Sequence, residues 1–84
     1  AALVLAGSLD RAVEAVRAGE RDVQRIRRLV EELIRAEPLA LIDYVEIYSY
    51  PGLEPVERLQ GQALLALAVK FGQTRLIDNV ILEG

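Results

Sequence analysis

The hydrophobic pattern of the chain changes at Pro38, and this change restricts the folds that the sequence can adopt. Before Pro38, apolar residues recur every three or four positions, as they do in amphipathic helices. After Pro38, β-branched and aromatic residues gather in short runs that glycines separate, which is typical of strands. The 84 residues suffice for one small domain. We therefore predict an α+β fold, in which an N-terminal αα-hairpin is followed by a small three-stranded antiparallel sheet.

Two helices are predicted in the first half, from about residue 2 to 18 and from about residue 22 to 36. The apolar stripe of the first consists of Leu5, Leu9, Val13 and Val16. The stripe of the second consists of Val23, Ile26, Val30 and Leu33, widened by Leu29 and Ile34. Gly19 is a suitable terminator for the first helix, Asp22 a suitable cap for the second, and Pro38 prevents continuation. The short connection between them predicts an antiparallel hairpin.

Three strands are predicted in the second half, over residues 41–50, 63–71 and 74–82. Residues 53–61 are expected to form a loop with at most a short extended piece. The run over 63–71 is ambiguous, because alanine, leucine and lysine favour a helix. Its short length between two glycines favours a buried strand instead. Gly72 and Gln73 fit the two-residue turn of a hairpin, so the third strand is expected to return along the second.

Apolar residues are expected on both faces of this sheet. Simple alternation puts Leu41, Val45 and Ile47 on one face of the first strand and Ile42, Tyr44 and Tyr48 on the other. The second strand offers Leu65, Leu67, Val69 and Phe71 against Leu64, Ala66 and Ala68. An antiparallel sheet with one solvated face would alternate apolar with polar residues. Since two helices can cover only one face, we expect a partner to cover the other.

The residue types that are missing exclude many kinds of active site. The chain has no cysteine and no histidine, which removes disulfides, zinc-finger ligand sets and Cys–His or Ser–His nucleophile pairs. Phosphate-loop and GxGxxG patterns are also absent. A net charge of −3 argues against a nucleic-acid-binding face, and no apolar run is long enough for a transmembrane helix. Among metal centres, only carboxylate-type sites remain possible on this composition. The sequence singles out no catalytic, nucleotide-binding or metal-binding residue.

Five residues of the predicted sheet are candidates for a structural or interdomain role: Asp43, Tyr44, Arg75, Asp78 and Asn79. Arg75 can make bidentate contacts with a carboxylate or a phosphate. For Asp43 and Asp78, pairing with Arg75 or accepting backbone N–H groups is favoured over acid–base catalysis, and a cross-strand contact between the two stays open. The polar groups of residues 74–79 suggest a fixed network.

The tyrosines Tyr44, Tyr48 and Tyr50 share one strand parity. Their rings could stack bases, as on sheet-type RNA readers, but such surfaces are accompanied by basic residues. Here the neighbour is Glu46. Packing or a protein interface is therefore the favoured interpretation.

Four stretches of the chain resemble a known family. They are GERD at residues 19–22, AEPLALIDYVEI at 36–47, LEPVERLQGQALLALAVKFGQTRLIDN at 53–79, and the short tail after it. Together they are similar to the C-terminal domain of pantothenate synthetase, also called pantoate–β-alanine ligase. The resemblance covers nearly the whole chain, and EPLALIDYVE and GQTRLIDN are its most specific parts.

This resemblance implies an enzymatic reaction whose catalytic residues lie outside this chain. The family condenses pantoate with β-alanine in the cytoplasm for coenzyme A synthesis. ATP with Mg²⁺ activates pantoate as an acyl adenylate, and AMP and pyrophosphate are released. A Rossmann-like N-terminal domain carries the histidine-containing nucleotide motif. Residues 1–84 would be the C-terminal lid domain, inactive alone, with neither ATP nor Mg²⁺ of its own.

The resemblance also implies partners, which are the N-terminal nucleotide-binding domain and a second subunit of a homodimeric parent. Nucleic acids and membranes are not expected partners. The apolar start without a capping residue suggests that the chain begins inside a helix. An engineered or proteolytic fragment is favoured over a natural chain that has lost a few residues. Two alternatives stay open at this stage: an autonomous protein-interaction module without enzymatic activity, and a single-stranded RNA binder using the tyrosines.

Overall fold

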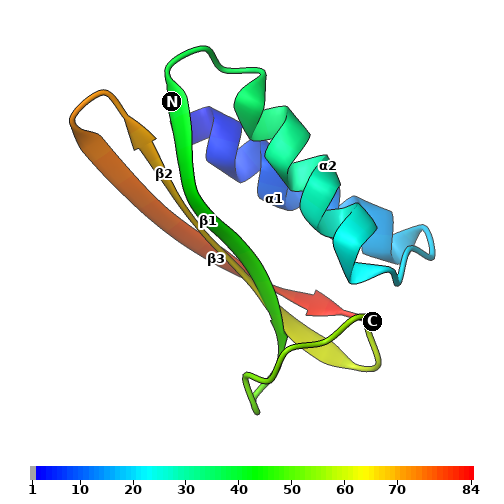
Figure 1. The fold of residues 1–84 in the computed structure, drawn as a ribbon. Coiled ribbons are helices and arrows are strands. Elements are labelled where there is room, and N and C mark those ends of the chain that lie inside the picture. Colours follow the sequence, from blue (N-terminus) through cyan, green and yellow to red (C-terminus); the bar gives the residue numbers. More distant parts are fainter. Residues whose placement is uncertain (1) are drawn as a thin grey trace.

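Two helices cover one face of a three-stranded antiparallel sheet (Figure 1). The computed structural model describes residues 2–84. The elements are α1 (Ala2–Arg17), α2 (Val23–Arg35), β1 (Ala40–Ser49), β2 (Gln62–Phe71) and β3 (Thr74–Glu83). The strands lie in the order β1-β2-β3, while α2 packs on β1 and α1 packs on β3. The predicted fold class, hairpin and sheet are confirmed.

The ends of the helices follow from the residues predicted to set them. Gly19, two residues after the end of α1, adopts a φ of +111°, which favours glycine. Asp22 caps α2, because its Oδ1 accepts the backbone N–H of Arg25 at 3.2 Å. The prediction placed Leu33 in the centre of the apolar stripe of α2 and Ile34 at its margin. In the structure Ile34 is fully buried and Leu33 is only half-buried.

The central strand β2 resolves the ambiguous apolar run in favour of a strand. It pairs with β1 on one side and β3 on the other, so its backbone groups are satisfied on both edges. Phe71 pairs with Thr74 around the two-residue turn, in which Gly72 has a φ of +62°. The loop over 53–61 contributes only isolated bridges, as expected.

The core lies between the helices and the sheet. Its largest fully buried apolar side chains are Ile26, Ile34, Leu65, Leu67, Leu82, Val30, Val45 and Val69. The loop adds Leu59, which is 5% exposed and whose N–H donates to the carbonyl of Arg21 at 2.9 Å. Neither helix of residues 2–84 is long and apolar enough to cross a membrane.

An irregularity in β1 corrects the predicted assignment of its faces. The register with β2 shifts between Ile42 and Tyr44, which leaves Asp43 as an extra residue. An extra residue inverts the alternation of side chains beyond it. Ile42 therefore joins the helix-covered face, and Leu41 joins Tyr44 on the other. The prediction that grouped Leu41 with Val45 was wrong.

Candidate functional site

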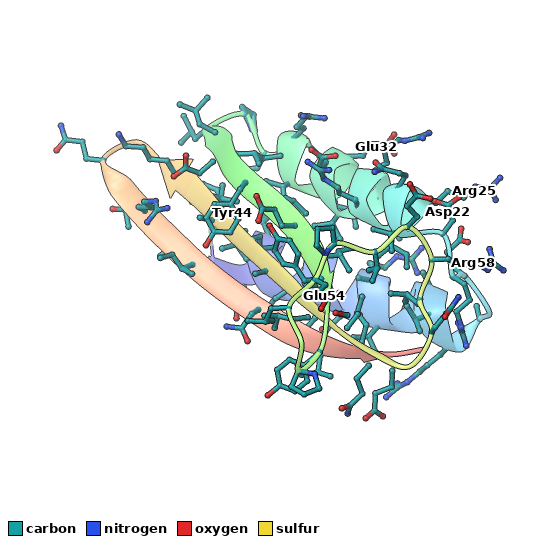
Figure 2. All side chains as sticks on the ribbon, turned by 60° about the horizontal axis from the view of Figure 1, so that its bottom comes forward. Asp22, Arg25, Glu32, Tyr44, Glu54 and Arg58 are labelled. Atoms are coloured by element: carbon teal, nitrogen blue, oxygen red, sulfur yellow. The ribbon has the colours of Figure 1, made fainter. Side chains whose placement is uncertain are left out.

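The sheet face opposite the helices is the candidate site, and we call it the open face. The strand register assigns to it Leu41, Tyr44, Glu46 and Tyr48 on β1, Leu64, Ala66, Ala68 and Lys70 on β2, and Arg75, Ile77, Asn79, Ile81 and Glu83 on β3. Figure 2 shows Tyr44 standing out from the sheet. Leu41 and Ile77 are 68% and 61% exposed, which is unusual for large apolar side chains.

The open face carries two apolar rows that run across the strands. In the first, Tyr44, Ala68 and Ile77 lie side by side. Ala68 is fully buried there although it lies outside the core cluster beneath the helices. In the second row, Tyr48, Leu64 and Ile81 are half-buried. These two rows make the open face the candidate contact surface of the chain.

A polar row separates these two apolar rows. It consists of Glu46, Ala66 and Asn79. The hydroxyl of Tyr48 donates a hydrogen bond to the carboxylate of Glu46. This hydrogen bond, with burial as a second cause, raises the pKa of Tyr48 above its ordinary value. The phenol therefore stays a neutral donor that holds the Glu46 carboxylate in place.

At one end of the open face an ion pair reaches over the central strand. Arg75 on β3 donates from Nε to Oδ2 of Asp43 on β1 at 2.8 Å. Both side chains are about half exposed, at 47% and 54%. Such exposed pairs contribute about 0.2–1 kcal/mol to stability. The pair and the neighbouring Lys70 give the apolar rows a charged rim, which is typical of docking surfaces.

The five candidate residues from the sequence divide between the two sides of the sheet. Tyr44, Arg75 and Asn79 lie on the open face, and Asp43 reaches it from the irregularity in β1. Asp78 has the opposite parity and lies on the helix side of β3, opposite Leu67. Its Oδ1 accepts the backbone N–H of Asn79 at 2.8 Å.

Asp43 and Asp78 do not meet, because β2 separates the two strands that carry them; Asp43 pairs with Arg75 and Asp78 accepts a backbone N–H, as favoured from the sequence. Residues 74–79 also form two separate contacts where one network was expected. The open-face residues that sequence reasoning missed are Leu41, Ile77 and Ile81. The signal for them was apolar character on both faces of every predicted strand.

Another polar group lies at the turn between the helices, where Figure 2 shows Asp22, Arg25 and Arg58. The backbones of Asp22 and Arg58 form a bridge, and the N–H of Val23 donates to the carbonyl of Glu57 at 3.1 Å. These contacts tie the loop to the start of α2. Their role is therefore to hold the loop against the helix layer.

Two further observations concern whether the described residues could bind a ligand or a metal ion. A shallow depression of about 310 Å³ lies between α2 and β1 and includes Arg27, Glu46 and Tyr48. Within residues 2–84 no group of three carboxylates could hold a metal ion. The chain contains neither histidine nor cysteine, so no Ser–His or Cys–His nucleophile pair can form within it.

Comparison with known proteins agrees with the resemblance seen in the sequence. Residues 1–81 match the family described as pantoate-beta-alanine ligase. The pantothenate synthetase of Pelotomaculum thermopropionicum is 68% identical over 82 residues, which are 98% of this chain and 29% of that protein. The pantothenate synthetase of Heliobacterium modesticaldum is 54% identical over 83 residues, covering 99% of this chain and 30% of that protein.

A solved structure shares the fold as well. The crystal structure of pantothenate synthetase from Thermus thermophilus superposes with a TM-score of 0.81 at 32% identity, over 92% of this chain and 28% of that one. The chain thus spans less than a third of the length of these relatives. The match over nearly all its residues shows that this chain belongs to the pantoate–β-alanine ligase family.

Proposed function

We propose that this chain is the C-terminal lid domain of a cytoplasmic ligase that joins pantoate to β-alanine. The observation that carries the proposal is the match of residues 1–81 to a ligase of which they form less than a third. In the proposed reaction ATP converts the pantoate carboxylate into an adenylate with release of pyrophosphate. The amine of β-alanine then attacks the activated carbonyl, and AMP leaves.

The described residues do not fit a role in binding ATP or Mg²⁺. They present no cluster of three metal-binding groups, and the sequence has no phosphate loop. We therefore assign ATP, Mg²⁺ and all catalytic groups to the rest of the ligase. The lid excludes water from the adenylate, a mixed anhydride that water would hydrolyse, and completes the site when it closes.

The open face is proposed as the surface by which the lid docks on the nucleotide-binding domain of the same polypeptide. Three features support this assignment: the exposed Leu41 and Ile77, the two apolar rows, and the charged rim around Arg75. A surface that alternates apolar and polar rows within a charged rim suits a contact that forms and separates in each catalytic cycle. A homodimeric parent enzyme is part of the same proposal.

A chimera of the Pelotomaculum thermopropionicum enzyme tests this function. The 82 matching residues of that enzyme are replaced by the aligned part of this chain, and formation of pantothenate and AMP is measured. We expect the chimera to be active, whereas the same enzyme without the segment and the 84-residue chain by itself are inactive. Pantothenate formation by the chain alone, or a folded but inactive chimera, contradicts the proposal.

A further inference from the structure

Strand β3 leaves one of its edges without a partner among the described residues. Its ten residues pair with β2 in an uninterrupted register, unlike those of β1. Because Phe71 and Thr74 close the hairpin, even-numbered residues of β3 bond to β2. Gly84 is also even-numbered, and its N–H donates to the carbonyl of Gly61 at 2.9 Å. The odd-numbered residues therefore direct their N–H and C=O groups away from the sheet.

The sequence of this edge is complementary to itself. If a second copy lies antiparallel with Asn79 opposite Asn79, then Arg75 faces Glu83 and Ile77 faces Ile81. All of these residues are odd-numbered, so each pair can exchange backbone hydrogen bonds while opposite charges and like apolar side chains meet. Other registers that keep odd-numbered residues opposite each other are shifted by two residues. A shift in one direction puts Asp78 opposite Asp78, and a shift in the other direction puts Ile77 opposite Glu83, so neither gives the same complementarity.

Asp78 opposes this pairing at its centre. Its Oδ1 accepts the outward N–H of Asn79 at 2.8 Å and so fills the position that a carbonyl of the second strand would take. Its charge also lies on the helix side of the strand, where the second copy would bring Val80 against it. Pairing would break a charged hydrogen bond and set a carboxylate against an apolar side chain. Charged residues on the inward face are one way in which natural sheets protect their edges.

We propose that the outer edge of β3 is a strand-pairing surface for a second copy of this chain, and that Asp78 keeps it closed. The proposal concerns the edge and does not rest on the proposed function of the open face. The proposed ligase reaction assigns no role to Asp78. In this proposal its role is to prevent pairing at the edge of β3. Removal of the Asp78 carboxylate opens the edge to pairing in one register.

Disulfide cross-linking tests the proposal well because the chain has no cysteine. Asn79→Cys places two thiols opposite each other across the predicted two-fold axis, at a separation that a disulfide can span. We expect the cross-linked fraction at fixed concentration to be low with Asp78 present and to rise about tenfold with Asp78→Ala, because the charged hydrogen bond is gone. Asp78→Asn keeps the capping oxygen but not the charge, so we expect a rise of about threefold.

The register gives the matched control. In the Asp78→Ala background, a mixture of Ile77→Cys and Ile81→Cys chains should cross-link, whereas either variant alone should not. Circular dichroism checks that each variant is folded, and if the alanine variant is not, the asparagine background carries the same comparison. Cross-linking that is independent of residue 78, or equal for the mixture and the single variants, overturns the proposal.

Discussion

The two faces of the sheet use the same three strands and many of the same residue types, yet they differ in burial and in polarity. Leu65 on the helix-covered face is fully buried, whereas its neighbour Leu64 on the open face is half-buried. The covered face is largely apolar beneath α1 and α2, with Asp78 on β3 as a charged exception. The open face alternates apolar and polar rows and carries an ion pair at its rim. The comparison indicates that the covered face holds the domain together, and it leaves the open face as the proposed docking surface.

Replacing each of these two leucines by alanine gives the largest expected contrast. Leu65→Ala should lower the free energy of unfolding by about 2–5 kcal/mol, because it removes buried methyl groups and leaves a cavity. Leu64→Ala should cost about 1 kcal/mol or less, since its side chain is only partly removed from water. Urea denaturation of the chain measures both changes. Equal losses would mean that the two faces do not differ in their contribution to stability.

In the chimeric ligase, a substitution on the open face should affect activity more than stability. Ile77→Ala removes an exposed side chain from the first apolar row, so the free energy of unfolding of the chain should change by less than about 0.5 kcal/mol. If this face docks on the nucleotide-binding domain, kcat/KM of the chimera should fall about tenfold, because Ile77 is buried only in the docked state. Steady-state assay of pantothenate formation measures this loss.

Leu53→Ala provides the control for that experiment. Leu53 is also exposed, at 53%, but it lies in the loop rather than on the sheet. We expect its substitution to leave kcat/KM unchanged within about twofold, in keeping with an ordinary surface position. A larger effect for Leu53→Ala than for Ile77→Ala would place the docking surface elsewhere.

The rim of the open face should contribute little to stability. A double-mutant cycle with Asp43→Asn and Arg75→Gln should give a coupling energy of about 0.2–1 kcal/mol, because both side chains are half exposed. High salt should reduce the coupling further. A coupling well above this range would mean that the ion pair stabilises the sheet as strongly as a core residue does.

The smallest effect concerns the polar row and its pH dependence. The pKa of Tyr48 is raised chiefly because its hydroxyl donates to Glu46. The folded chain therefore holds this proton more tightly than the unfolded chain, so the contribution to stability is present below pH about 10 and is lost as the pH rises through the folded pKa. Glu46→Gln should lower the pKa of Tyr48. Ultraviolet titration of tyrosinate, with Tyr44 and Tyr50 replaced by phenylalanine, measures the change.

The sequence predicted the elements well because their signals are local. Stripes at helical spacing, the cap at Asp22 and the turn at Gly72 each depend on a few neighbouring residues, and all three are confirmed. The family was also predicted correctly. The faces of β1 were predicted wrongly because the irregularity at Asp43 inverts the alternation, and only pairing with β2 reveals it.

The partners of the polar residues depend equally on tertiary structure. Arg75 and Asp43 are 32 positions apart, and they meet only because β1 and β3 flank the same central strand. By itself the sequence determined which segments are helices and strands, since backbone preference and hydrophobic period act over short distances. The tertiary structure decided which apolar residues the helices cover and which remain on the open face. That outcome is set by strand register, in which one extra residue moves every later side chain to the opposite side.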